Sequence, residues 1–284
     1  MRNVTDGKRQ GLQWSLTSTL EDLDYADDIS LLSNRLQDIQ AKSDSLLSTA
    51  ATIGLKMNVK KTKLMRKNTS NNKPVTINGN RIEEVNEFTY LGSKITTDAD
   101  SEKEINTRIT KATQAFAMLK TIWKSTSIKL NTKLKIFRSN ILSVLLYGAE
   151  CWKTTTTIEQ KLEVFQNKCL RRILKIFWPN TISNEELRNR AGISPIAEII
   201  QKRRWQWLGH VLRMSTHSIP RTALRWTPQG RRNRGRPKET WRRTIDKDLK
   251  SRGLTINTAP NIAADRSKWK SLAIALRARR RRED

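Results

Sequence analysis

The stretch EDLDYADDISLL, residues 21–32, places Asp24, Asp27 and Asp28 within five residues of a chain whose formal net charge is +28. Like charges this close repel one another and destabilise a fold unless a cation holds them. Two carboxylates on a rigid turn are oxygen ligands of the kind that Mg²⁺ prefers. We therefore predict a hairpin that turns at Asp27–Asp28. The turn is either a metal site or a surface turn in which Asp is simply favoured.

The composition points to a polyanionic partner. The 284 residues include 55 Lys and Arg against 27 Asp and Glu, and residues 201–284 account for +18 of the net charge. Such a charge balance favours a polyanionic partner, most often nucleic acid, because phosphate neutralisation releases counterions. The two cysteines, Cys151 and Cys169, are too few for a secreted disulfide framework, and we expect both to be buried on helices. No signal peptide or membrane span is expected, so the chain is predicted to be intracellular, nuclear or cytoplasmic.

Residues after the acidic stretch are predicted to continue as strands and one helix. Helical spacing of apolar residues predicts a helix over 35–53, preceded by Ser33–Asn34 as a candidate N-cap and closed by Gly54. The alternation in 55–65 predicts a strand. The Asn-Gly pair in 75–82 predicts a hairpin. The segment 88–96 is β-type, with a glycine placed as at a bulge or a close backbone approach.

The pattern becomes helical beyond Asp98. We predict helices over five ranges: 101–123, 131–148, 158–177, 183–192 and 194–214. Ser183 with Glu186 three residues later is a capping-box pattern. A Gly/Pro/Arg-rich loop at 227–241 precedes a short helix over 239–253 and then a basic helix or tail over 265–282.

Three boxes in order resemble one family. Tyr25-Ala26-Asp27-Asp28 is similar to the F/Y-A-D-D box of reverse transcriptases of non-LTR (LINE-type, RTE- or Jockey-like) retrotransposons. GLKMNVKKTKLM (54–65) is similar to the family's G-L-x-x-N-x-x-K-T-K box, and FTYLGSKIT (88–96) to its Y-L-G box. The segments 145–152, 203–214 and 230–245 resemble the region that follows the polymerase in many such elements.

The resemblance implies an α+β fold in three parts. Residues 1–97 would form a partial reverse-transcriptase palm, made of β-hairpins plus one helix. Residues 98–192 would form an all-helical thumb-like region. Residues 193–284 would form a basic, helical, Arg/Trp-rich region that binds nucleic acid.

The resemblance also implies roles for matched residues. Asp27 and Asp28 would be catalytic metal ligands for Mg²⁺ or Mn²⁺. Lys61 would meet the triphosphate or act as a general acid, and otherwise is one solvated lysine among many. Tyr25, Leu91 and Gly92 would contact nucleic acid, although Leu91–Gly92 alone also fits an ordinary bulge. The partners would be an RNA template, a DNA primer or target and, in the full-length parent, dNTPs.

A two-metal polymerase site needs a further carboxylate from an earlier strand. The family carries it in an Asp-x-x-x-Ala-Phe box, and Asp6 is the sole aspartate before Glu21. We therefore expect a fragment of an RNA-directed DNA polymerase, without its fingers and endonuclease and inactive alone. The metal would bind only if missing upstream residues completed the site.

The basic end supports a second hypothesis, a non-enzymatic DNA/RNA-binding protein that acts through residues 200–284. The predicted nucleic-acid-binding residues there are Arg203, Arg204, Arg231, Arg232, Arg234, Arg236 and Lys238. Arg234-Gly235-Arg236-Pro237 matches the core of an AT-hook, which reads the minor groove. A generic phosphate-binding loop or nuclear-localisation patch fits the same residues. The nearby tryptophans could stack on bases or anchor helix packing.

Overall fold

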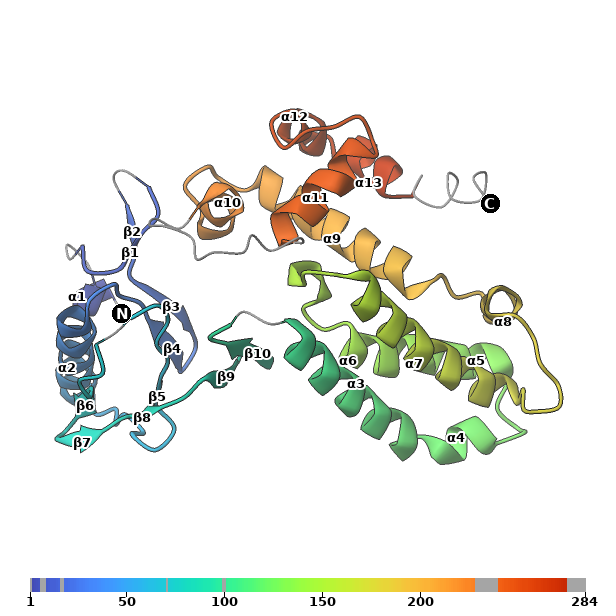
Figure 1. Ribbon diagram of the computed structural model, residues 1–284, viewed down its shortest axis with the longest axis horizontal. Helices are drawn as coiled ribbons and strands as arrows, with labels where there is room; N and C mark the ends of the chain where they lie inside the picture. Colours follow the sequence, from blue (N-terminus) through green and yellow to red (C-terminus); the bar gives the residue numbers. More distant parts are fainter. Residues whose placement is uncertain are drawn as a thin grey trace. The chain divides into compact units, whose positions relative to one another are not determined.

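Packing divides the chain into two units. The computed structural model describes residues 2–5, 9–15, 18–69, 71–98, 101–227 and 240–274. Unit 1 consists of Met1–Asp100 and Thr222–Arg231, and unit 2 of Ser101–Arg221 and Arg232–Asp284. The architecture mixes strands and helices (Figure 1).

Unit 1 is built from short strand pairs around one long helix, α2 (Leu36–Thr52). The strands are β1 (Leu12–Gln13), β2 (Thr19–Leu20), β3 (Asp22–Tyr25), β4 (Asp28–Leu31), β5 (Lys63–Leu64), β6 (Thr76–Ile77), β7 (Asn80–Arg81), β8 (Glu83–Glu84), β9 (Glu87–Tyr90) and β10 (Ser93–Thr96), and a short helix α1 (Arg2–Thr5) precedes them. The antiparallel pairs are β1–β2, β3–β4, β6–β7 and β9–β10, whereas β5 and β8 are parallel. Small sheets of this kind depend on side-chain packing for stability.

The core of unit 1 lies between α2 and the β6–β7 hairpin. Val75, Ile77 and Ile82 are buried there. Half-buried apolar residues surround them: Leu36, Ile39, Leu47, Met57, Val59 and Leu64. The apolar residues of α2 thus pack against the β6–β7 hairpin and the segment 57–64, and α1 and β4 also contact this helix.

The strand predicted over 55–65 is largely wrong. Only Lys63–Leu64 pairs as a strand. The N–H groups of Lys61 and Thr62 both donate to the Asn58 carbonyl, which makes a turn. The alternating Met57 and Val59 reflect packing on the α2 core, not strand pairing.

Unit 2 is helical. It contains α3 (Ser101–Met118), α4 (Lys120–Lys124), α5 (Leu130–Ile136), α6 (Ser143–Leu145), α7 (Thr156–Leu174), α8 (Asn184–Ala191), α9 (Ile196–Arg213), α11 (Trp241–Lys250), α12 (Ala259–Ala264) and α13 (Arg266–Ile274), and α10 (Ile219–Arg225) crosses the unit boundary. The helix predicted over 131–148 is interrupted by a π-helical segment, Phe137–Leu142. The Ser183 cap is confirmed, since its side chain accepts from the Glu186 N–H.

One large core holds the first part of unit 2 together. It takes buried residues from α3 through α9, including Phe137, Leu162 and Ile200. Phe116 and Trp123 stack with their ring centroids 4.9 Å apart. This core runs past residue 192 to Ile200, so the division expected at 192 is not a packing boundary.

The C-terminal helices α12 and α13 pack on α9. Trp269 of α13 lies against Trp205 of α9 with centroids 4.6 Å apart. Its indole Nε1–H donates to the Trp205 carbonyl at 2.9 Å. Gly209 makes this approach possible, because a Cβ there would lie 2.2 Å from the Trp269 Nε1.

Candidate nucleic-acid interface

The acidic stretch forms a tight hairpin. Strands β3 and β4 pair so that Tyr25 lies opposite Asp28, and the two-residue turn is Ala26–Asp27. The predicted turn at Asp27–Asp28 is therefore displaced by one residue, and Asp28 begins the return strand. Tyr25, Asp27 and Asp28 are exposed, so the hairpin tip is accessible to a ligand.

The carboxylates of the hairpin do not form a complete metal site. Side chains alternate between faces along a strand, so Asp28 shares a face with Tyr25, while Asp24 lies on the other face opposite Ile29. Across the described ranges, no group of three or more His, Cys, Asp or Glu side chains could hold a metal ion. Asp27 and Asp28 are therefore the only two carboxylates that the described residues offer at the tip, and waters or phosphate oxygens would have to fill the rest of the near-octahedral shell of Mg²⁺.

A buried lysine fixes the base of this hairpin to α2. Lys42 is fully buried, and its Nζ lies 2.5 Å from Glu21 Oε2. The same ammonium group donates to the Glu21 carbonyl at 3.1 Å and to the Leu32 carbonyl at 2.7 Å. One cation therefore ties both ends of the β3–β4 hairpin to the helix.

The pKa of Glu21 reflects this contact. Partial burial raises it, but hydrogen bonds from Lys42 and Thr19 outweigh burial, so the pKa lies below its ordinary value. The ionised form of Glu21 is therefore favoured in the folded protein.

The Y-L-G box lies against strand β3 of the acidic hairpin. Tyr90 ends β9, and its hydroxyl donates to the Leu23 carbonyl of β3 at 3.2 Å, across 67 residues of sequence. Burial raises the pKa of Tyr90, and the negative charges of Asp28 and Asp24 raise it further. The hydroxyl thus stays protonated next to the acidic hairpin and can keep donating.

Leu91 and Gly92 form the turn between β9 and β10. Tyr90 lies opposite Ser93 in this pair, so the expected bulge or ordinary β-segment is a two-residue hairpin. Both residues have positive φ, 47° at Leu91 and 78° at Gly92. Leucine is strained in this region, whereas glycine is not.

Lys61 lies in the turn after α2, with an exposed side chain. Its backbone N–H donates to Asn58 Oδ1 at 3.1 Å. Among the described residues, no ion pair joins Lys61 to Asp27 or Asp28. The predicted catalytic role of Lys61 is therefore not supported by an ion pair with these two carboxylates.

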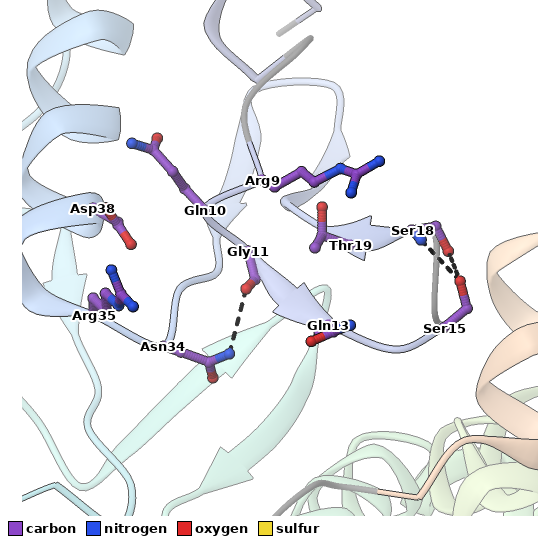
Figure 2. Close-up of a pocket in the computed structure, with 10 residues that line it drawn as sticks. All are labelled: Arg9, Gln10, Gly11, Gln13, Ser15, Ser18, Thr19, Asn34, Arg35 and Asp38. Carbon is purple, nitrogen blue, oxygen red and sulfur yellow. Dashed lines mark hydrogen bonds between the residues drawn. The ribbon is translucent and has the colours of Figure 1, made fainter.

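A polar pocket of about 420 Å³ lies beside the hairpin base. Its lining residues are Arg9, Gln10, Gly11, Gln13, Ser15, Ser18, Thr19, Asn34, Arg35 and Asp38. Figure 2 shows residues of the β1–β2 hairpin on one side and Arg35 and Asp38 at the start of α2 on the other, with Asn34 donating to the Gly11 carbonyl at 3.4 Å. None of the predicted site residues that the structure describes lines this pocket.

Two of the predicted phosphate-binding arginines are engaged within the fold. Arg204 is buried, and its Nε lies 3.1 Å from Asp248 Oδ2. Arg203 donates to the Leu146 carbonyl at 2.6 Å. The assignment of Arg204 to nucleic-acid binding is wrong, because its guanidinium is buried against a carboxylate. Arg231, Arg232, Arg234, Arg236 and Lys238, with the AT-hook match, lie outside the described residues.

The tryptophans of α9 and α11 serve packing. Trp205 is buried against Trp269, and Trp207 meets Trp241 edge to face at 5.4 Å. Trp241 also donates to the Glu150 carbonyl at 2.9 Å. Trp226 donates to the Gln13 carbonyl at 3.2 Å, within unit 1. The packing interpretation is thereby confirmed for Trp205, Trp207 and Trp241.

The cysteines differ from each other. Cys169 is buried on α7 as predicted, whereas Cys151 is exposed, which corrects the expectation for that residue. Desolvation raises the pKa of both thiols, to about 11 at Cys151 and about 12 at Cys169. Neither thiol is therefore an activated nucleophile.

Sequence reasoning overlooked Tyr90 and Lys42. Tyr90 stands inside the Y-L-G box, so its position gave a usable signal. Lys42 gave none, because a lysine on a helix is normally exposed.

No helix within the described ranges is both long and apolar enough to cross a membrane.

Comparisons with known proteins are consistent with a mobile-element origin. Residues 115–147 match a family described as a domain of unknown function (DUF6451). An uncharacterised transposon-derived protein of Caenorhabditis elegans is 26% identical over 262 residues, which cover 88% of this chain and 94% of that protein. No solved structure matches. The similarity to the nematode protein supports a transposable-element origin for this chain.

Proposed function

We propose that the chain derives from the reverse transcriptase of a non-LTR retrotransposon, binds primer–template nucleic acid and does not extend a primer by itself. The transposon-derived relative supports the origin, since the similarity extends over most of both chains. The order of the three sequence boxes supports the polymerase class. The formal net charge of +28 supports a nucleic-acid partner.

One observation carries this proposal. The hydrogen bond from the Tyr90 hydroxyl to the Leu23 carbonyl joins the Y-L-G box to the acidic hairpin. A polymerase needs its carboxylates close to the segment that holds the primer end. The two segments that resemble polymerase boxes meet through a specific side-chain hydrogen bond. This contact favours a shared polymerase site over two unrelated surface turns.

Backbone strain in the same two hairpins gives independent support. Ala26 has φ of 55° and Leu91 has φ of 47°. The β6–β7 hairpin uses Asn78–Gly79 at its turn, residues that accept this conformation readily. Strained residues kept where relaxed ones would serve are characteristic of functional sites.

Within this proposal, Asp27 and Asp28 would hold Mg²⁺ or Mn²⁺, which stabilises negative charge on phosphates when bound. The described residues supply only this pair, so further ligands would have to come from elsewhere. Tyr25, exposed on the same face as Asp28, would contact the nucleic acid. The protein's own task is to keep the carboxylates fixed, through Lys42 and Tyr90.

Two assays test the proposal on the full 284-residue chain. A labelled primer–template should bind with steep salt dependence, and the bound chain should protect the primer 3′ end from exonuclease. Primer extension with Mg²⁺ or Mn²⁺ should be absent. Extension that Asp27→Asn abolishes would refute the inactivity, and no binding at low salt would refute the whole proposal.

A second candidate function is nucleic-acid binding through the basic end alone. Residues 201–284 contain 24 Lys and Arg against 6 Asp and Glu, which favours it. Changing Arg231, Arg232, Arg234, Arg236 and Lys238 to Gln in the full chain separates the two. If that variant loses all binding and 3′-end protection never occurs, the second function holds. If protection persists and Tyr90→Phe weakens it, the first holds.

A further inference from the structure

Two aromatic side chains protrude from the loop between α7 and α8, residues 175–182. Trp178 is 87% exposed and Phe177 is 60% exposed. Tryptophan and phenylalanine normally bury most of their surface. Within the described part of the chain, neither ring stacks on another aromatic ring. Their exposure therefore requires an explanation outside the packing of unit 2.

The loop that presents these rings is fixed. Lys175 caps α7 in the left-handed conformation, and the Ile176 N–H donates to the Arg171 carbonyl at 2.9 Å. The Arg171 guanidinium donates to the Ile182 carbonyl at 3.3 Å and to Asn184 Oδ1 at 2.8 Å. The Asn180 N–H donates to the Phe177 carbonyl at 2.9 Å. A prearranged loop loses little entropy when a ligand binds.

Three exposed cationic side chains lie on the last turns of α7 and at the start of the same loop. Lys168 and Arg172 are four residues apart on α7 and so share one face, and Lys175 follows at its end. None of the three forms an ion pair with a carboxylate among the described residues. Cations at a helix C-terminus complement the helix dipole, which explains part of this charge. It does not explain the exposed rings beside them.

We propose that the Phe177–Trp178 loop is a stacking site for the bases of single-stranded nucleic acid, with Lys168, Arg172 and Lys175 neutralising its phosphates. Aromatic rings interleaved with cations are the usual composition of such sites, since every base offers a face for stacking. A protein partner would use the rings but leave three cations without a counter-charge. This inference rests on the proposed nucleic-acid binding and specifies its single-stranded form.

The test uses the full chain and fluorescence anisotropy over a salt series. The probes are labelled single-stranded RNA and DNA of about 20 nucleotides, and a duplex of the same sequence. Trp178→Ala should weaken single-strand binding about 5- to 150-fold, with an unchanged salt slope, and Trp178→Phe should keep most of the affinity. Lys168→Gln with Arg172→Gln should instead lower the slope by about 0.7 for each phosphate that is no longer neutralised.

Val164→Ala is the matched control, since Val164 is 66% exposed on the same helix and should leave every binding constant unchanged. If Trp178→Ala binds single strands as the wild type does, the stacking site is refuted while the proposed function stands. Equal loss on duplex and single strand also refutes it. Self-association abolished by Trp178→Ala, with binding intact, would make the loop a protein contact and refute the stacking site. A wild type that binds no nucleic acid refutes both proposals.

Discussion

Lys42 shows how one side chain determines local order in unit 1. Its ammonium group is fully buried and contacts the Glu21 carboxylate and two carbonyls at the ends of the β3–β4 hairpin. Charging a buried group without partners is costly, so both members of this pair depend on each other. Lys42 thus fixes the base of the hairpin and does not contact the carboxylates at its tip.

Lys42→Met should destabilise unit 1 by about 3 kcal/mol, because Glu21 loses its partner and two carbonyls lose a donor. Hydrogen exchange of the β3 and β4 amides measures the opening free energy of this region. Lys56→Met, at an exposed lysine, should change it little. A loss below about 1 kcal/mol, as for a surface pair, would show that the contact is not desolvated.

Glu21 makes this region sensitive to acid. Its pKa is lower in the folded state than in the unfolded chain, so the unfolded state binds a proton first. The stabilisation is fully present above the ordinary Glu pKa of about 4.3 and is lost as the pH falls through the lower, folded value.

The free energy of unfolding should be measured for the wild type and Glu21→Gln between about pH 6 and pH 3. The wild type should be the more stable protein near pH 6, and this difference in stability should disappear near pH 3. The control, Glu83→Gln, removes a carboxylate that pairs with Lys63 at the surface. A constant gap between wild type and Glu21→Gln across the range would contradict the lowered pKa.

At the scale of elements, the β9–β10 turn is strained and the β6–β7 turn is not. The β9–β10 turn places Leu91 at φ of 47°, where an L-residue other than Gly or Asn is disfavoured by about 1–2 kcal/mol. The hairpin β6–β7 places Asn78 at φ of 51°, where Asn is well suited.

Leu91→Asn should therefore stabilise the β9–β10 hairpin by about 1 kcal/mol, and Asn78→Leu should destabilise β6–β7 by a similar amount. Amide exchange in each hairpin measures both changes. If Leu91→Asn weakens the hairpin, then packing of the leucine side chain outweighs the backbone strain.

The contact between α9 and α11 includes a buried ion pair whose members are not well compensated. Burial lowers the pKa of Arg204 and raises the pKa of Asp248, although each attracts the other. Desolvation thus exceeds their attraction. Gln201 adds one hydrogen bond to Asp248 at 2.8 Å.

Arg204→Met alone should destabilise unit 2 by about 3 kcal/mol, because Asp248 stays buried without its partner. Arg204→Met with Asp248→Leu should recover most of that loss, since two apolar side chains can pack in the same space. Chemical denaturation of the wild type, Arg204→Met, Asp248→Leu and the double variant measures this cycle. A double variant as unstable as the single one would show that the pair stabilises the fold.

Element types were predictable from the sequence wherever a local signal was strong. The Asn78–Gly79 hairpin, the Ser183 cap and the long helices follow from turn chemistry, capping and periodicity. Ser33–Asn34 was expected to cap α2, but Arg35 occupies that position without a side-chain cap. The short helices α10 and α12 carried too few turns for a periodic signal.

The site was predictable only in part. The residues of the acidic hairpin and the Y-L-G segment could be named, but the contact between them depends on a fold that brings Tyr90 to Leu23. Burial of Arg204 depends on α11, a helix distant along the chain. Charge content alone could not tell an arginine buried in an ion pair from one on the surface.

Considering the whole molecule, the two units differ in the size of their cores. Unit 1 relies on a cluster around Val75, Ile77 and Ile82, together with strand pairs of two to four residues. Unit 2 has an extended core contributed by α3 through α9. Stability scales with buried apolar surface, so unit 1 is the weaker unit.

Hydrogen exchange with mass spectrometry along a urea series should show the peptides of unit 1 opening at lower denaturant than those of α3 and α7. Peptides containing residues 222–227 should open together with unit 1, since Trp226 donates to the Gln13 carbonyl. A single midpoint for all peptides would contradict the division into units. The comparison requires no truncation, so both units are measured in the intact chain.

The space at Gly209, between α9 and α13, is too small for even one methyl group. The indole of Trp269 occupies the space where any other residue would place its Cβ, and it cannot yield, because it is packed on Trp205 and hydrogen-bonded to it. A single added carbon would therefore act as a wedge between α9 and α13. This position accordingly determines whether α13 stays docked on the rest of unit 2.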